Sequence, residues 1–321
     1  MQDKFEMFDE LPEDVKIETT QSLSNRDLVN LAKTSKYHLA LFKPVMDARK
    51  ILHKLLHHVT RGEHDEVKAM LKQDISLIFK RGIIVKDCSG REFENISGFE
   101  YALWALDKHM WAAMIGCIPS NEEGRKVFSQ LIAQYNKVNT EGVTYKLNGK
   151  TITEQHFDFE NTIIKELQTQ VDSINAPGVK NWEAIDKQWR EGAGGAQKKL
   201  PMHIVFAYCS NEPFSPVPKF TAQPKSSKQQ FYNWTTKKDE NWFSIDSKLS
   251  ADLAIFKGGR FRAEASEATG RVQWFPGVLA GALPLDLVAM KALCEVRTND
   301  FIALKSQLED QMTLDNPYQV S

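Results

Sequence analysis

Pairs of apolar helices on either side of a short hairpin constrain the fold of residues 51–136 more than any other pattern in the chain. The first predicted pair is ILHKLLHHV, ending at Gly62, and DEVKAMLKQDISLIF, in which Val67 and Leu71 recur at helical spacing. A hairpin is expected about residues 88–90, and the helices GFEYALWALDKHMWAAMIGCI and EEGRKVFSQLIAQYNKV follow it. This order is typical of stacked helical repeats, so we expect a mainly α fold with short β-hairpins.

A stretch near the C-terminus repeats the spacing of the first helix pair. LHHVTRGEHDEVKAML and LCEVRTNDFIALKSQL each place a short turn between two apolar helices, with an acidic residue opening the second. The matching positions are Leu56, Val59, Val67 and Leu71 in one stretch and Leu293, Val296, Leu304 and Leu308 in the other. The match predicts a second helix–turn–helix unit at residues 293–308, with chance recurrence over so short a stretch as the alternative.

The middle of the chain mixes hairpin and helix signals. Asn148-Gly149 is the residue pair of a type I′ turn, and alternating residues flank it, so a hairpin is expected over residues 143–153. A long helix is expected from Asp158 to Ile174, where Asn-Ala-Pro-Gly ends it. A later apolar helix is expected to be kinked or divided at Pro201.

Prolines and glycines then interrupt the regular pattern. Residues 210–240 hold four prolines among many polar residues, which favours a long loop or lid over a regular element. LAIFKGGRFRAE and RVQWF predict a short hairpin across Gly258-Gly259.

The charge balance excludes several classes of function. The 321 residues include 41 Lys and Arg against 42 Asp and Glu, a formal net charge of −1. A protein that wraps nucleic acid needs a cationic excess, and an anionic membrane surface attracts one as well, so we expect neither partner. No apolar stretch approaches the length of a membrane-spanning helix, and the first residues lack the pattern of a secretory signal peptide. The four scattered cysteines indicate reduced thiols.

Histidines and cysteines offer two candidate sites, and neither is well supported. His53 and His57 lie four positions apart on one predicted helix face, but a structural zinc site needs four ligands and only two are well placed. We therefore expect a polar stripe and no metal. Cys209 could act as a nucleophile with His203 as its base, but six positions along a helix place them on nearly opposite faces. A buried structural thiol is the favoured interpretation, and we expect no catalytic residues.

Two further motifs have ordinary structural interpretations. EGAGGAQKK, residues 191–199, lacks the Gly-Lys-Ser/Thr ending of a phosphate-binding loop, so we expect a turn leading into a closely packed helix and no cofactor. Aromatic residues interleave with lysines between residues 182 and 243, which could serve single-stranded nucleic acid. Core packing or a protein-binding surface is the favoured use, because the net charge does not support nucleic acid binding.

The N-terminal sequence LPEDVKIETTQSLSNRDLVNLAKTSKYHLAL, residues 11–41, predicts three short helices, with Ser24 and Ser35 as N-caps of the second and third. It resembles an F-box over about thirty residues. The resemblance implies that the apolar positions dock on the Skp-type adaptor of a cullin–RING (SCF) ubiquitin ligase. Those positions are Leu11, Pro12, Val15, Ile17, Leu23, Leu28 and Leu31. Thr19-Thr20 replaces an apolar pair usual in that family, and losing two apolar contacts would weaken docking.

The rest of the chain carries two broader resemblances. Residues 51–136 resemble degenerate ankyrin-type repeats, although the usual Thr-Pro-Leu-His signature is missing. Most of residues 51–310 resembles effector proteins secreted by intracellular bacterial pathogens, on the stretches WREGAGGAQKKLPMHIVFAYC, PFSPVPKF and MKALCEVRTNDFIALKSQL. These resemblances imply a protein that leaves the bacterium and acts in the host cytoplasm.

Together, the sequence predicts two parts: an F-box-like adaptor-binding segment at residues 1–50 and an ankyrin-like helical domain at residues 51–321. The expected function is recruitment of a host protein, whose identity the sequence does not give, for ubiquitination. Two alternatives stay open. The large domain could be an enzyme that modifies a host protein, for which a deep pocket with clustered polar groups would be the sign. It could also sequester a host protein without catalysis.

Overall fold

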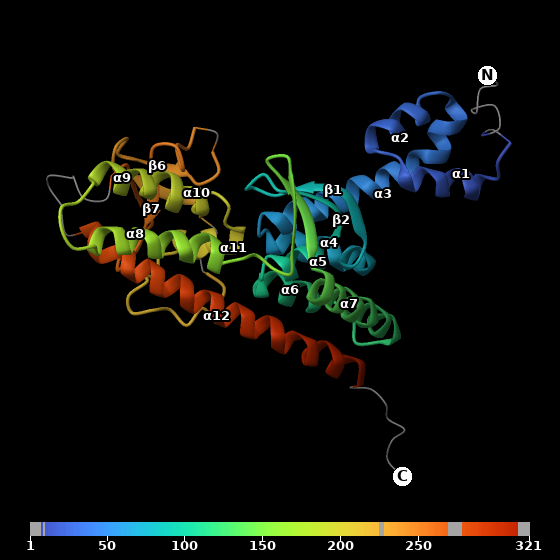
Figure 1. Cartoon of the computed structure of the whole chain (residues 1–321). Helices are drawn as coiled ribbons and strands as arrows, with labels where there is room; N and C mark the ends of the chain where they lie inside the picture. The colour runs from blue at the N-terminus through green and yellow to red at the C-terminus, as the bar shows by residue number, and fades with distance from the viewer. Residues whose placement is uncertain (1–7, 9, 225–227, 245, 269–277, 314–321) are drawn as a thin grey trace, which may run out of the picture.

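A small three-helix segment projects from the main body of the protein at the end of one long helix (Figure 1). The computed structural model describes residues 8, 10–224, 228–244, 246–268 and 278–313. The segment consists of α1 (Glu13–Thr19), η2 (Thr20–Ser22), α2 (Asn25–Ala32) and the first half of α3 (Lys36–Thr60). Both predicted N-caps are confirmed: Ser24 Oγ accepts from the Asp27 amide at 3.1 Å, and Ser35 Oγ from the His38 amide at 3.0 Å.

Helix α3 joins the projecting segment to the body without a break. The expected domain boundary at residue 50 lies inside this helix, which packs on a different apolar core on each side of that point. The small core of the segment contains Leu28, Ala32 and Phe42, and the large core of the body begins at Leu52.

The first half of the body follows the predicted order of helix pair, hairpin and helix pair. Its elements are α4 (His64–Gln73), η3 (Ile75–Ile78), β1 (Arg81–Lys86), β2 (Glu92–Ser97), α5 (Gly98–Trp104), α6 (Lys108–Ile115), α7 (Glu122–Glu141), β3 (Val143–Leu147) and β4 (Lys150–Glu154). The four strands form one antiparallel sheet in the order β1-β2-β3-β4. The β3–β4 hairpin is confirmed, with positive φ at both Asn148 and Gly149.

One helix predicted in this half is in fact two. The stretch that begins at Gly98 is divided between α5 and α6, because Asp107 caps the N-terminus of α6 by accepting from the Met110 amide at 3.0 Å. Leu106, just before the cap, takes the left-handed conformation with φ 55°.

The second half of the body contains helices and a second small sheet. Its elements are η4 (Glu160–Ile164), α8 (Lys165–Asn175), α9 (Trp182–Lys187), η5 (Gln188–Ala193), α10 (Gly194–Gln197), α11 (Met202–Cys209), β5 (Gln230–Asn233), β6 (Lys238–Asn241), β7 (Ala254–Phe256), β8 (Glu264–Ser266) and α12 (Val278–Thr313). The sheet order is β6-β5-β8-β7. The mainly α class is therefore confirmed, with β-hairpins in both halves.

The structure confirms some of the local predictions for this half and corrects others. The long helix from residue 158 is present as η4 and α8, and Pro201 begins α11. The hairpin across Gly258-Gly259 is present as β7 and β8, while residues 271–275 lie outside the described residues. The loop predicted for residues 210–240 ends early, because β5 and β6 pair at its C-terminal end.

The helix–turn–helix unit predicted at residues 293–308 is wrong, because α12 runs through it unbroken. Asp300, the acidic residue expected to open a helix, instead forms ion pairs with Lys108 at 2.6 Å and Arg297 at 3.0 Å. Helix α12 packs against α7 in the first half and against α8 in the second, along the lower side of the body (Figure 1). Both halves therefore share one large apolar core.

Arg91 also joins the two halves. Its guanidinium carbon lies 5.1 Å from the Trp104 ring centroid, and the rings of Tyr145 and Phe157 are at 5.3 and 5.4 Å. Its Nη1 donates to the Lys199 carbonyl oxygen at 2.8 Å. The side chain is 2% exposed, so these contacts hold a cation in the interior.

Candidate functional site

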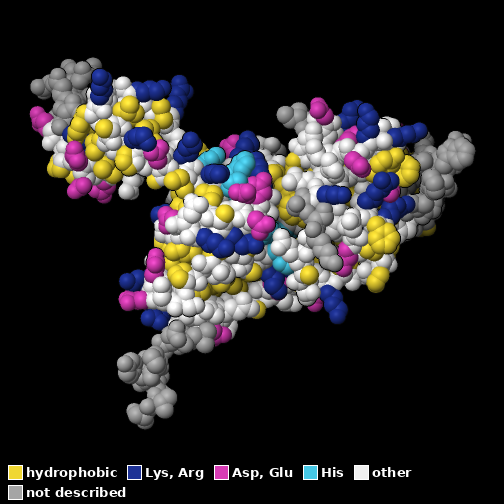
Figure 2. All heavy atoms as spheres, turned by 180° about the vertical axis from the view of Figure 1, so that it is seen from behind, with side chains coloured by type: hydrophobic (Ala, Val, Ile, Leu, Met, Phe, Trp, Pro, Cys, Tyr) yellow, Lys and Arg dark blue, Asp and Glu magenta, His cyan; other side chains and the backbone are white. Residues whose placement is uncertain are grey.

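The F-box-like residues retain exposed surface, with one exception. Leu28 is only 1% exposed and packs inside the small core, so it is not available for direct docking. The other six are exposed or half-buried: Leu11, Pro12, Val15, Ile17, Leu23 and Leu31. Figure 2 shows apolar side chains spread over this projecting segment, at the upper left.

Helix α1 and the start of η2 each place a polar side chain inward, while Val15 and Ile17 of α1 keep exposed surface. Lys16 is 3% exposed, and its Nζ lies 5.1 Å from the centroid of the Tyr37 ring. Thr20 is fully buried, and its hydroxyl donates to the Ile17 carbonyl at 2.6 Å. Of the pair Thr19-Thr20, Thr20 therefore has a structural role inside the segment, whereas Thr19 is exposed.

Arg49 fixes the turn between α1 and α2 against α3. Its Nη1 donates to the Leu23 carbonyl at 2.9 Å and its Nη2 to the Thr20 carbonyl at 2.6 Å. These bonds satisfy carbonyl groups at the end of a short helix and hold the turn against the long one.

The histidines and the Cys209–His203 pair that the sequence offered as candidate sites do not come together in the structure. His58 contacts Glu63, and within the described ranges no three His, Cys, Asp or Glu side chains group closely enough to hold a metal ion. Burial raises the pKa of Cys209 to about 12. His203 does not face Cys209, since its Nε2 donates to the Ala105 carbonyl at 2.7 Å. The pair therefore lacks the hydrogen bond that an activated nucleophile needs.

The glycine-rich stretch is helical, as the end of η5 and α10, where a turn was expected, and this stretch and two of the tryptophans serve packing. A Cβ on Gly194 would lie 2.7 Å from the Leu253 carbonyl oxygen, so this glycine permits close contact between α10 and the residues before β7. Trp189 and Trp242 are buried, and their indole nitrogens donate to the carbonyls of Ser266 and Gln197. Core packing is the use that the structure shows for both tryptophans.

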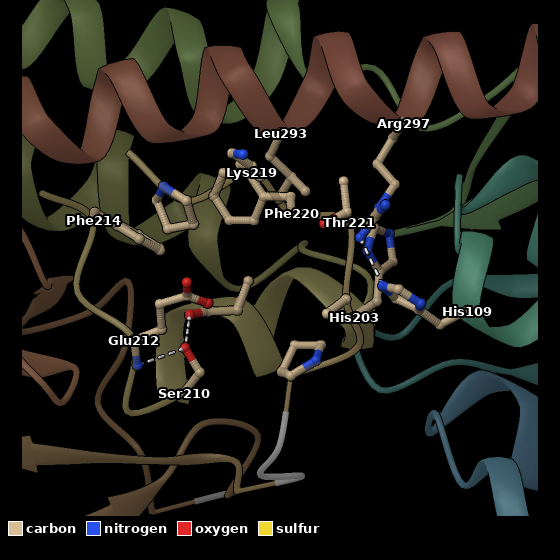
Figure 3. Close-up of a pocket in the computed structure, with 14 residues that line it drawn as sticks. His109, His203, Ser210, Glu212, Phe214, Lys219, Phe220, Thr221, Leu293 and Arg297 are labelled. Carbon is tan, nitrogen blue, oxygen red and sulfur yellow. Dashed lines mark hydrogen bonds between the residues drawn. The ribbon is translucent and has the colours of Figure 1, made fainter. Parts of the chain in front are cut away.

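A cavity of about 270 Å³ lies where the two halves of the body meet. Helices α6, α11 and α12 and the loop after α11 supply its walls. The lining residues are His109, His203, Ala207, Ser210, Glu212, Phe214, Pro218, Lys219, Phe220, Thr221, Ala222, Pro224, Leu293 and Arg297. In Figure 3, Arg297 reaches from α12 toward His109, and the Phe214 side of the cavity lies opposite.

Arg297 is the buried charge of this cavity. Its side chain is 3% exposed, with Nη1 3.0 Å from an Asp300 carboxylate oxygen and Nη2 3.0 Å from His109 Nε2. A guanidinium only donates, so His109 accepts through Nε2 and is neutral. Burial and the nearby Arg297 charge both lower the pKa of His109, to about 4. Within the part of the chain that the structure describes, Arg297 Nε has no hydrogen-bond partner.

Lys257 holds the Ser210 end of the cavity. It is fully buried, and its Nζ donates to the carbonyl oxygens of Ala207 and Ser210, each at 2.8 Å, and to Ser210 Oγ at 2.9 Å. A cation at the C-terminus of α11 is favourable because it meets the negative end of the helix dipole. Desolvation is the main cause that lowers the pKa of Lys257, to about 8.

Asp286 holds the backbone on the other side of Lys257. Its carboxylate accepts from the amides of Lys257 and Gly258, at 2.9 and 2.6 Å. Burial raises the pKa of Asp286 to about 7, against the lowering effect of these two bonds.

Sequence reasoning missed this cavity because its polar residues come from separate elements. His109 and Arg297 carry no local motif, and the spacing around residue 297 suggested a turn. The proline-rich stretch after residue 210 was the usable signal, since it predicted a lid and supplies most of one wall.

Comparison with known proteins places the chain in a family. A family model described as the CBUA0006 C-terminal domain matches residues 162–308, the half that supplies His203, Arg297 and the proline-rich wall. The Uncharacterized protein CBUA0006 of Coxiella burnetii (strain RSA 493 / Nine Mile phase I) is 36% identical over 270 residues, which covers 78% of this chain and 74% of that protein. No solved structure matches the chain. No helix among the described residues combines the length and apolar character needed to span a membrane. The chain belongs to the family of the Coxiella protein CBUA0006.

Proposed function

We propose that the chain is an adaptor of two parts, secreted by a bacterium into the host cytoplasm. The projecting N-terminal segment docks on the Skp-type subunit of a cullin–RING ubiquitin ligase, as an F-box does. The body, ankyrin-like in its first half, holds a host protein beside the ligase for ubiquitination. The chain contributes proximity, because it raises the effective concentration of the target at the ligase.

The exposed apolar residues of the segment carry this proposal. Val15 is 38% exposed and lies beside the half-buried Leu11 and Ile17, so these residues offer an apolar face that a partner can cover. Full burial of one such side chain contributes about 1.5–3 kcal/mol. Several of them together can offset the free energy that association requires.

The long helix supports the adaptor geometry. Helix α3 has 25 residues and so spans about 37 Å from the segment into the body. Arg49 ties the docking turn to this helix through the Leu23 and Thr20 carbonyls. A docked segment would therefore hold the body, and its bound target, at a fixed distance from the ligase.

A surface on the second half suits target binding. Phe261 is 71% exposed and Trp234 is 46% exposed, although both are large apolar side chains. Arg262 stacks on Tyr232, with its guanidinium carbon 4.0 Å from the ring centroid. Aromatic residues and arginine dominate the binding energy of protein interfaces, so we place the host-target contact here.

Reconstituted docking tests the proposal with a matched pair of variants. Val15 and Val29 are 38% and 37% exposed on the same segment, but only Val15 belongs to the F-box-like set. Val15→Asp should abolish binding of the purified Skp-type adaptor, measured by calorimetry, and Val29→Asp should leave it near the wild-type value. Equal binding by wild type and Val15→Asp would refute the docking face.

An enzyme that modifies a host protein is the second candidate. The cavity at the junction of the two halves favours it, since His109 and His203 both have a pKa lowered to about 4 there. Polar groups with perturbed pKa in a cleft are characteristic of active sites, although structural networks produce them too. Modification of a host protein by the purified chain without a ligase would favour the enzyme.

A further inference from the structure

The cavity between the halves has a polar end and an apolar end. Arg297 and His109 lie at the polar end, and Figure 3 shows Arg297 extending into the space from α12. Phe214 and Leu293, each 1% exposed, line the other end. Phe220 lies beside Phe214, with 6.2 Å between the ring centroids. A volume of about 270 Å³ is small for a ligand site, which typically measures about 300–1,000 Å³, so any occupant is small.

The hydrogen-bonding capacity of the buried Arg297 side chain is only partly satisfied. Each terminal nitrogen donates one bond, to Asp300 and to His109, whereas Nε has no partner among the described residues although the side chain is buried. Leaving a buried donor unsatisfied costs free energy, and more for a charged group. A ligand oxygen at this position would remove that cost, and a charged carboxylate would do so better than a neutral carbonyl.

The remaining charges around the polar end nearly cancel. Lys108 pairs with Asp300 at 2.6 Å, and Asp107 caps α6 through the Met110 amide. Lys219 and Glu212 line the cavity from the loop, and both are exposed. Neutral His203 contributes no charge, since burial lowers its pKa to about 4. Because these charges already balance, an anion at this end relies on the unpartnered Arg297 Nε, and a dianion would add twice the uncompensated charge of a monoanion.

We propose that the cavity binds a small monocarboxylate with an apolar body, its carboxylate accepting from Arg297 Nε and its body lying against Phe214, Phe220 and Leu293. The observations that carry it are the unpartnered buried donor and the apolar wall opposite. This binding is independent of ligase docking, because the N-terminal segment supplies no residue to the cavity.

Titration of 3-phenylpropionate into the full chain at pH 7, followed by ligand-observed NMR, tests the proposal. The neutral 3-phenylpropionamide has the same body, and inorganic phosphate has the charge without the body. Binding of the carboxylate at least tenfold tighter than of either comparison probe is expected. Binding of the amide or of phosphate as tight as that of 3-phenylpropionate, or no binding of 3-phenylpropionate, would overturn it.

Variants of the two ends separate the cavity from other surfaces. Arg297→Met and Phe220→Ala should each weaken 3-phenylpropionate binding at least tenfold. Phe220 is a half-buried loop residue, so its variant tests the site even if Arg297→Met does not fold. Lys305→Met is the control, because it removes one charge from the exposed side of the same helix. Wild-type binding by folded Phe220→Ala, or equal loss in Lys305→Met, would contradict the assignment.

Discussion

Arg297 Nη2 lies 3.0 Å from His109 Nε2, although 188 residues separate them in sequence. This bond connects α12 to α6 and so joins the second half of the body to the first. The cavity forms beside it, and its polar end exists only when both halves are folded together. Stability and ligand binding should therefore depend on the same few long-range contacts.

Replacing Arg91 should destabilise the whole body. Arg91→Met keeps much of the side-chain volume between the aromatic rings, but it leaves the Lys199 carbonyl without its donor and Asp87 Oδ2 without its ion-pair partner. Removing one member of a buried ion pair costs about 3–5 kcal/mol. Urea denaturation measures this loss. Arg26→Met, at an exposed position, should change the free energy of unfolding by less than about 0.5 kcal/mol.

Replacing Lys257 should loosen the end of α11. Lys257→Met leaves the Ser210 carbonyl without its donor and removes one of the two donors of the Ala207 carbonyl, and a buried unsatisfied group costs about 1–3 kcal/mol. The expected result is a lower thermal midpoint and faster amide hydrogen exchange near Ser210. Lys248→Met is the matched control, since that lysine is exposed and pairs only on the surface with Asp252. Equal midpoints for the two variants would contradict the assigned role.

His203 should make stability depend on pH in the acid range. Its folded pKa is about 4, below the ordinary 6.5, because burial disfavours the charged ring. The unfolded chain therefore binds a proton that the folded chain does not between these values. The contribution of neutral His203 to the free energy of unfolding is therefore complete above pH 6.5 and decreases as the pH falls toward 4. The total decrease is about 3 kcal/mol, because one pKa unit corresponds to about 1.4 kcal/mol.

Comparison with a variant isolates this contribution. Asp286 acts in the opposite direction, because its raised pKa lets the folded chain hold a proton between about 4 and 7. The free energy of unfolding of wild type and His203→Gln should therefore be measured side by side from pH 7 to pH 4. The gap between the two should shrink as the pH falls, and a constant gap would show that His203 does not titrate as described.

The exposed aromatic surface should matter for target recruitment and not for docking. Phe261→Ala should reduce ubiquitination of the host target several-fold in a reconstituted ligase, since exposed aromatic side chains supply most of the energy of such contacts. Binding of the Skp-type adaptor should stay at the wild-type value. Loss of adaptor binding, or full target ubiquitination, would place the target contact elsewhere.

Local signals predicted the elements of this fold better than their arrangement. Ser24, Ser35 and Asn148-Gly149 specify caps and a turn through their own neighbours, so the sequence predicts them correctly. The turn expected near Asp300 failed because that carboxylate pairs with Lys108 from a distant helix. Such a partner becomes known only when the chain is folded.

The candidate sites show the same difference between local signals, which the sequence predicts, and contacts between distant residues, which it does not. Helical spacing predicted apolar residues in the N-terminal segment, but not that Leu28 would be buried while Val15 stays exposed. That distinction depends on how α2 packs on α3. The sequence could not predict the cavity, because Arg297 and His109 acquire their roles from each other and lie far apart in the sequence.

Direct capture of the Skp-type adaptor is the measurement that tests the central proposal most directly. Purified full-length chain is immobilised beside a variant carrying Leu11→Ala and Pro12→Ala together, and each is exposed to the purified adaptor and to host lysate. The wild type should retain the adaptor, and the double variant should bind it at least tenfold more weakly, a difference of at least about 1.4 kcal/mol. Absence of the adaptor from the wild-type sample, or equal retention by both chains, would contradict the assignment of an F-box adaptor.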